Sequence, residues 1–186
     1  MRVRPTELPE VLLVEPVVRG DARGFFLETY HAAKYREAGI ALPFVQDNHS
    51  RSAPGILRGL HAQLGEPLGK LVRCVRGAIF DVAVDMRRGS PTYGRHVSLV
   101  LNAADGGQMF VPKGFAHGFC TLEPDTEVVY KVTALYAPQC DKGIAFDDPD
   151  LGIAWPIAPA DAVLSDKDRR HPRLRDLPAH FTYAAS

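Results

Sequence analysis

The sequence predicts an all-β protein, a sandwich or barrel with a few short helices. Its apolar residues mostly fall in short runs, and glycine, proline, asparagine and aspartate interrupt these runs at close spacing. Only one segment has a clear helical pattern, which leaves little material for a helical layer. The runs that read as strands are residues 11–18, 25–30, 44–48, 71–75, 78–86, 96–101, 108–112 and 127–136.

Residue periodicity identifies individual elements within this pattern. In residues 78–86, large apolar side chains alternate with Asp81 and Asp85, which predicts a strand with one buried face. Residues 31–39 show the clearest helix pattern and end at a capping glycine. A second short helix is expected after the motif LSDKD.

Length and composition limit the classes of function. The 186 residues suit a single domain, and 22 Lys plus Arg balance 22 Asp plus Glu. This balance provides no basic surface for a nucleic acid or a membrane. No apolar run suits a signal peptide or a membrane span. Cys74, Cys120 and Cys140 form no CxxC pair, so reduced thiols in a cytoplasmic protein are expected.

The residues around His61 look like the remains of a metal site. Cupin-type barrels carry the motifs G-x5-H-x-H-x(3–6)-E-x6-G and P-x-G-x2-H, and residues 112–117 match the second. In the first motif, Gln63 stands where the second histidine would be, and Lys70 takes the glutamate's place, with six residues between it and Gly77. A charged ammonium has only donors and cannot ligate a metal. The spacing therefore predicts no catalytic metal.

The sequence leaves two interpretations of Lys70 open. It could replace the metal as the electrophile that stabilises an oxyanion, with His61 as a general base. It could instead begin a strand and keep its ammonium in solvent, which spacing alone favours because most lysines are exposed.

Two further residues are candidates for proton chemistry. Tyr130 shares a strand face with two valines, so it points inward, either as a core residue or as a proton donor. Asp168 could orient a histidine or cap a helix. The remaining histidines are interpreted as structural: His31, His49, His96, His171 and His180.

These residues lie in longer motifs that resemble one family. In order, the motifs are DARGFFLETY, FVQDNHSRS, GILRGLHAQ, KLVRCVRGAIFDVAVDMRRGSPTYG, FVPKGFAHGF, VVYKVT and LSDKD. Over residues 3–175, the chain is similar to the dTDP-4-dehydrorhamnose 3,5-epimerases of the dTDP-L-rhamnose pathway. The resemblance implies a cupin-type double-stranded β-helix, or jelly roll, which is a homodimer and uses no metal or other cofactor.

The resemblance also implies a reaction. The substrate would be dTDP-4-dehydro-6-deoxy-D-glucose, whose C4 ketone acidifies the protons on C3 and C5, and the product dTDP-4-dehydro-L-rhamnose. His61 matches the base, and Asp168 matches the carboxylate that orients it. Lys70 matches the group beside the C4 oxygen. Tyr130 matches the proton donor on the opposite face.

The family's substrate-binding residues also have counterparts in this chain. Those expected from the partner subunit, through an exchanged N-terminal strand, are Arg23, Phe26 and Glu28. Those expected around the nucleotide, its diphosphate and the sugar are Gln46, Asn48, Arg58, His117 and Lys167. The family usually has two adjacent aromatics before a proline here, and one of them helps to enclose the thymine. Tyr136 keeps one of the two, whereas Leu135 replaces the other, which weakens a stacking contact.

The resemblance divides residues 1–186 into three parts of one domain. Strands to about residue 55 would take part in dimer exchange, residues 56–136 would form the core, and residues 137–186 would wrap around it. Strict alternation puts Arg58 and His61 on opposite faces of a strand, whereas the resemblance implies that both lie near the substrate. An irregularity is therefore expected at Gly59, between them.

Other functions remain as alternatives. An epimerase acting on C3 or C5 alone, or a 3,4-ketoisomerase on the same barrel, would use a similar base. A sugar-nucleotide-binding protein without turnover would need neither a base nor an opposed acid. We expect epimerisation of both carbons.

Overall fold

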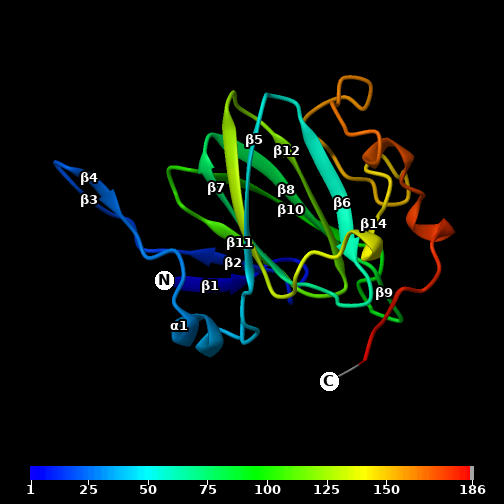
Figure 1. Ribbon diagram of the computed structural model, residues 1–186, viewed down its shortest axis with the longest axis horizontal. Helices are drawn as coiled ribbons and strands as arrows, with labels where there is room; N and C mark the ends of the chain where they lie inside the picture. The colour runs from blue at the N-terminus through cyan, green and yellow to red at the C-terminus, as the bar shows by residue number, and fades with distance from the viewer. Residues whose placement is uncertain (185–186) are drawn as a thin grey trace.

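The computed structural model describes residues 1–184, which form two β-sheets packed face to face (Figure 1). The predicted all-β architecture is therefore confirmed. The six-stranded sheet contains, in order, β1 (Arg2–Pro5), β2 (Leu12–Glu15), β11 (Gln108–Val111), β7 (Lys70–Arg76), β13 (Thr126–Val132) and β5 (Gln46–Ser52). The five-stranded sheet contains β10 (His96–Asn102), β8 (Ala78–Asp85), β12 (Phe115–Thr121), β6 (Leu57–Gln63) and β14 (Asp141–Gly143).

Short elements complete the chain. Two small pairs are β3 (Arg19–Asp21) with β4 (Gly24–Phe26), and β9 (Arg87–Arg88) with β15 (Phe181–Thr182). The helices are α1 (Ala32–Glu37) and the 3₁₀ turns η1 (Pro138–Cys140), η2 (Asp168–Arg170) and η3 (Leu174–Asp176). Within residues 1–184, no helix is long and apolar enough to cross a membrane.

The helix predicted at residues 31–39 is present, and the strand predictions are partly correct. The helix α1 stops before Gly39, whose φ of +90° suits glycine. The helix predicted after LSDKD is only the turn η2. The strand predicted for residues 25–30 ends at Phe26, because the chain then turns toward α1. The apolar runs did not indicate β1, which is largely exposed.

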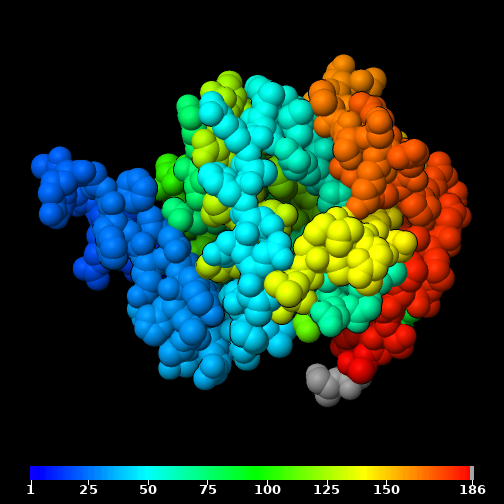
Figure 2. Space-filling view, in the orientation of Figure 1, coloured from blue at the N-terminus to red at the C-terminus, as the bar shows by residue number. Residues whose placement is uncertain are grey.

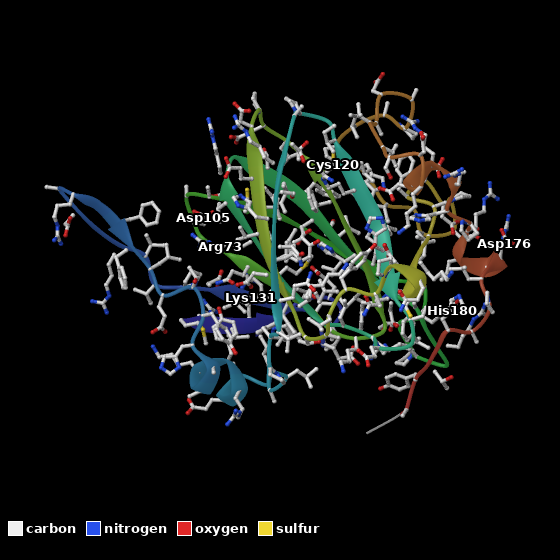
Figure 3. All side chains as sticks on the ribbon, viewed as in Figure 1. Arg73, Asp105, Cys120, Lys131, Asp176 and His180 are labelled. Carbon is white, nitrogen blue, oxygen red and sulfur yellow. The ribbon has the colours of Figure 1, made fainter. Side chains whose placement is uncertain are left out.

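The main core lies between the two sheets, where side chains fill the space (Figure 3). Val72 and Val128 of the six-stranded sheet face Ile79 and Phe119 of the five-stranded sheet in one buried cluster. Burying side chains of this size contributes about 1.5–3 kcal/mol each. This packing fixes the separation of the sheets, and thereby the width of the space between them.

The strand β8 is buried on both faces, so the prediction of one polar, exposed face was wrong. Asp81 and Asp85 are 0% exposed and point into the sandwich. On the other face, Val82 and Val84 pack against the C-terminal segment in a second buried cluster. Alternation correctly separated the two faces, but the face with the carboxylates is covered by the opposite sheet, whereas the C-terminal segment covers the apolar face.

The segment that follows Tyr136 covers the outer face of the five-stranded sheet. In Figure 1 it runs in yellow to red past β6 and β8, and Figure 2 shows it closing that side of the molecule. Ile144, Leu151 and Leu174 are its buried anchors in the second cluster. The wrap therefore brings Asp168 beside β6.

The irregularity expected at Gly59 is present. The β6–β12 register shifts between His117 and Phe119, and Gly59 has a φ of +130°. A Cβ on Gly59 would lie 2.6 Å from the Cα of Gly118, so the two backbones approach too closely for a side chain. The register shift allows Arg58 and His61 to line the same cavity.

The hairpin of β3 and β4 projects away from the rest of the chain (Figure 1). Phe25 and Phe26 near its end are 67% and 71% exposed. Two adjacent exposed phenylalanines are unusual for a surface that faces only water, and they indicate a contact surface.

We expect Gly59→Ala to destabilise the protein more than Gly89→Ala. Both glycines have positive φ, at +130° and +86°, but an added Cβ at Gly89 has no atom within 4 Å. Gly89→Ala should therefore cost only backbone strain, about 1–3 kcal/mol. Gly59→Ala should add overpacking of about 1–3 kcal/mol. Urea unfolding of both variants measures the difference, and equal losses would contradict the close-approach argument.

Candidate active site

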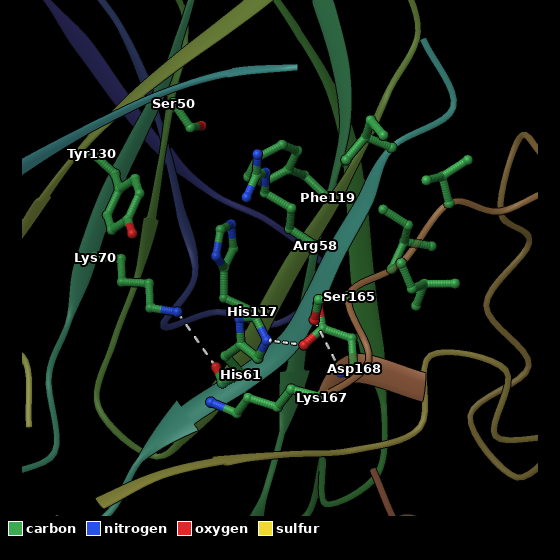
Figure 4. A pocket seen from close by; sticks show the side chains of 14 residues that line it. Ser50, Arg58, His61, Lys70, His117, Phe119, Tyr130, Ser165, Lys167 and Asp168 are labelled. Atoms are coloured by element: carbon green, nitrogen blue, oxygen red, sulfur yellow. Dashed lines mark hydrogen bonds and ion pairs between the residues drawn. The ribbon is translucent and has the colours of Figure 1, made fainter. Parts of the chain in front are cut away.

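A cavity opens between the two sheets beside the main core, and Phe119 of that core lines it. It has two adjoining lobes of about 460 and 310 Å³, and His61, Lys70 and Tyr130 line both. Figure 4 shows the larger lobe, and Figure 2 shows the hollow in the surface between β5 and the C-terminal segment. The other predicted residues on its walls are Gln46, Asn48, Arg58, His117, Tyr136, Lys167 and Asp168.

The His61–Asp168 pair is the best-defined interaction in the cavity. His61 Nε2 lies 2.7 Å from Asp168 Oδ1, and Asp168 is 5% exposed. Burial works to raise the pKa of Asp168, but hydrogen bonds from His61 and the Gly59 amide lower it below its ordinary value. An ionised carboxylate only accepts hydrogen bonds, so Nε2 carries the ring proton. His61 Nδ1 then has a free lone pair.

The local structure around η2 holds Asp168 in place. Its backbone amide bonds the Ser165 hydroxyl at 3.2 Å, and the Gly59 amide donates to Oδ2 at 3.4 Å. Of the two sequence interpretations of Asp168, the structure supports the one in which this carboxylate orients a histidine, His61.

Lys70 points into the cavity from β7, so the interpretation that placed its ammonium in solvent was wrong. Its Nζ donates to the His61 carbonyl at 3.4 Å. Burial lowers the pKa of Lys70 to about 8, although Asp141 and Asp81 act in the opposite direction. A cation at this position is poorly solvated, which favours its pairing with an anion that enters the cavity.

Tyr130 faces His61 from the other side of the cavity (Figure 4). It lies on β13 of the six-stranded sheet, whereas His61 lies on β6 of the five-stranded sheet. Val128 and Val132 on the same face are buried, which confirms that Tyr130 points inward. Burial raises the pKa of Tyr130, so its hydroxyl keeps its proton at neutral pH.

His117 forms a second histidine–carboxylate pair, with a partner that the sequence did not identify. Its Nε2 lies 2.7 Å from Asp81 Oδ1, and both side chains are buried. Burial lowers the pKa of His117 despite this carboxylate, which favours the neutral imidazole. The sequence signal that could have identified this partner was the carboxylate of Asp81 within a mostly apolar strand. A carboxylate buried in such a strand requires a hydrogen-bond partner.

Polar residues at the cavity rim form the remaining contacts. The Arg58 guanidinium bonds Ser52 Oγ at 3.1 Å, and Lys167 pairs with Asp141. The Tyr136 hydroxyl donates to Asp141 Oδ2 at 3.0 Å, and Leu135 is 63% exposed.

Gln46 positions two of the predicted nucleotide contacts. Its Nε2 donates to Asn48 Oδ1 at 2.8 Å, and its Oε1 accepts from the Tyr136 amide at 3.0 Å. All three residues line the smaller lobe.

Three predicted binding residues lie outside this chain's cavity. Arg23 and Phe26 belong to the projecting hairpin, where Arg23 pairs with Asp21 at 2.6 Å. Glu28 pairs with Lys34 at 2.6 Å. A contribution from these residues to a cavity would require a second copy of the chain.

The residues at the cupin ligand positions do not suit a metal. Gln63 is tied to the backbone, donating to Glu66 and Leu135 and accepting from the Ala137 amide. Lys70 is a cation. A different group, His61, Asp168 and His171, has one potential ligand atom each within 4.8 Å of the others.

Comparisons with known proteins agree with this geometry. The family model described as dTDP-4-dehydrorhamnose 3,5-epimerase matches residues 5–176. A protein of this description from Shigella flexneri is 50% identical over 171 residues, covering 90% of this chain and 93% of that protein.

Solved structures of similar fold are also sugar-nucleotide epimerases. The Legionella pneumophila dTDP-6-deoxy-D-glucose-3,5-epimerase, in complex with dTDP-4-keto-L-rhamnose, has a TM-score of 0.96 at 43% identity, with 99% of each chain covered. A 3′-monoepimerase from Streptomyces bikiniensis, in complex with dTDP-quinovose, has a TM-score of 0.86 at 35% identity, with 92% and 87% covered.

We expect Lys70 to lose its proton near pH 8 instead of the ordinary 10.5. The side chain is then an ammonium below pH 8 and a neutral amine above it, so its ability to stabilise an anion falls as the pH rises through 8. The measurement is an NMR titration of the lysine Cε signals, with Lys70→Met identifying the signal. A Lys70 titration near 10.5 would contradict the burial argument.

Proposed function

The chain belongs to the dTDP-4-dehydrorhamnose 3,5-epimerase family, and we propose that its own cavity inverts C3 and C5 of dTDP-4-dehydro-6-deoxy-D-glucose. The predicted family, the cupin-type fold and the isomerase class are thereby confirmed. The observation that carries the assignment of residues is the placement of His61 and Tyr130 on opposite sheets, with Lys70 between them (Figure 4). Inversion needs a base and an acid on opposite faces of one carbon.

The reaction follows from the protonation states of these groups. His61 Nδ1 takes the proton from C3 or C5, and the electrons of the broken C–H bond move through the C–C bond to the C4 oxygen. The Lys70 ammonium stabilises the resulting enolate. The Tyr130 hydroxyl then delivers a proton to the opposite face, and solvent returns a proton to Tyr130 and removes one from His61. Repetition at the other carbon gives dTDP-4-dehydro-L-rhamnose.

Each of these catalytic roles has a typical contribution to the rate. A positioned general base typically contributes about 10²–10⁴-fold. One donor at a developing oxyanion contributes about 10²–10³-fold. Asp168 fixes the tautomer of His61 and stabilises the imidazolium that forms, without taking the proton itself.

The cavity rim suits a nucleoside diphosphate. Arg58 and Lys167 supply two positive charges at the larger lobe, and a guanidinium fork matches phosphate oxygens. Gln46, Asn48 and Tyr136 supply amide and aromatic groups at the smaller lobe, where the thymine would bind. His117, held by Asp81, would contact the sugar.

A homodimer would complete this site. We propose that the β3–β4 hairpin reaches the cavity of a second copy, where Phe26 covers the thymine and Arg23 and Glu28 contact the nucleotide. The support is the exposure of the hairpin and its projection from its own chain. A cytoplasmic location also remains a proposal, consistent with a nucleotide-sugar substrate.

Incubation of the protein with the dTDP-4-keto sugar in D₂O tests the reaction. We expect deuterium at both C3 and C5, because every proton delivered after enolate formation comes from groups that exchange with solvent. NMR of the product measures the positions. Deuterium at one carbon would indicate a single-site epimerase, a C3 carbonyl would indicate the ketoisomerase, and no exchange would overturn the enzymatic proposal.

Two variants separate the base from the acid in the same assay. His61→Asn should lower the rate of deuterium entry by about 10²–10⁴-fold, while dTDP binding persists. Tyr130→Phe should still exchange substrate protons on the His61 side, but should form far less inverted product. Equal loss of exchange and inversion in both variants would contradict their assignment to opposite faces.

A mixed dimer tests the exchanged hairpin. An Arg23→Ala subunit paired with a His61→Ala subunit should recover activity, because one of the two cavities would combine the intact His61 of one chain with the intact Arg23 of the other. Steady-state rates of co-expressed and separately purified variants measure the recovery. If Arg23 acts within its own chain, every cavity of the mixed dimer carries a lesion and activity does not recover.

A further inference from the structure

His171 lies against the base His61 without an evident bonding role. The two ring centroids are 5.5 Å apart and the planes meet at 89°. Both ring nitrogens of His171 are buried, and neither has a hydrogen-bond partner within residues 1–184. Leaving a buried polar group unpaired costs about 1–3 kcal/mol, and such groups often mark a site for a missing partner.

His171, His61 and Asp168 together form a recognisable ligand set. One donor atom from each lies within 4.8 Å of the others. Zinc binds imidazole nitrogen and carboxylate oxygen at about 2.0–2.2 Å, which places tetrahedral ligands about 3.3 Å apart. His61 Nε2 and Asp168 Oδ1 are 2.7 Å apart, so zinc bound to both would replace their hydrogen bond and separate them slightly. The His171 donor lies within 4.8 Å of both atoms and would move closer to them.

We propose that His61, Asp168 and His171 form an inhibitory site for Zn²⁺ or a chemically similar late transition-metal ion. Two imidazoles and one carboxylate suit Zn²⁺, whereas Mg²⁺ and Ca²⁺ prefer sets made of oxygen ligands. His61 and Asp168 line the larger lobe of the cavity, from which water could reach a fourth position. This site shares only His61 with the cupin motif, whose next two ligand positions hold Gln63 and Lys70.

Local structure keeps the three side chains together. Asp168 and His171 stand at the two ends of the turn η2, and the His171 amide bonds the Asp168 carbonyl at 3.4 Å. The strand β14 pairs with β6 so that Gly143 lies opposite His61. Any side chain at Gly143 would overlap the His171 ring, so this glycine makes room for His171.

Metal binding would remove the base by changing its tautomer. A metal bound at His61 Nε2 replaces the proton now held there, and the neutral ring keeps its single proton by carrying it on Nδ1. No lone pair then faces the substrate. This inhibition depends on the proposed role of His61, whereas metal binding itself does not.

Metal titration of the apo-protein tests the site. Calorimetry should show one Zn²⁺ per chain, and Co²⁺ should give the intense visible absorption of tetrahedral coordination. In the epimerase assay, Zn²⁺ should inhibit and EDTA should restore the rate, while Mg²⁺ and Ca²⁺ should have no effect. Binding without inhibition would leave the ligand set intact and count against the role of His61 as base.

The variant His171→Phe provides the decisive comparison. Phenylalanine keeps a ring against His61 and Gly143 but has no donor, so basal turnover should persist while Zn²⁺ affinity falls by at least about tenfold. His31→Ala, at an exposed histidine, and Cys140→Ser, at a half-buried thiol near β14, should bind Zn²⁺ like the unmodified protein. Unchanged affinity in His171→Phe, or loss in Cys140→Ser alone, would overturn the proposal.

Discussion

The His61–Asp168 hydrogen bond is the interaction on which the site depends, because it joins the two parts of the chain that build the cavity. His61 belongs to the five-stranded sheet, and Asp168 belongs to the C-terminal segment 107 residues later. The bond is short because the segment is anchored elsewhere by Ile144, Leu151 and Leu174. Hydrophobic packing on the outer face of the sheet thus determines which nitrogen of His61 carries a proton on the inner face.

The sandwich also explains how charges can be buried at the centre of a small protein. Asp81 and Lys70 point between the sheets from opposite layers, and each would be costly to desolvate alone. His117 satisfies one oxygen of Asp81, while the other has no partner within the described chain. Within residues 1–184, the Lys70 ammonium has only a long bond to a backbone carbonyl. Incomplete pairing of this cation is expected where its missing partner is an anionic substrate.

The sequence predicted the site where its signals were local. His61, Lys70 and His117 stand out because cupin motifs have fixed spacing along neighbouring strands, and Gly59 stands out because Arg58 and His61 violate alternation. The direction of Lys70 was not predictable, since spacing does not reveal whether a strand begins inside a cavity. Asp81 was misread because alternation separates two faces without saying what covers them. The approach of His171 to His61 depends on how the C-terminal segment folds back, which no local pattern records.

The number of carbons inverted is set by space more than by the identity of the catalytic groups. A monoepimerase shares this fold at 35% identity, so the architecture alone does not require two inversions. For one base and one acid to serve both C3 and C5, the sugar must turn about its C4 oxygen while the nucleotide stays bound. Lys70 suits the pivot, because it lines both lobes between His61 and Tyr130. A change in the lobe walls that blocks this rotation would convert a double epimerase into a single one without altering the base, the acid or the cation.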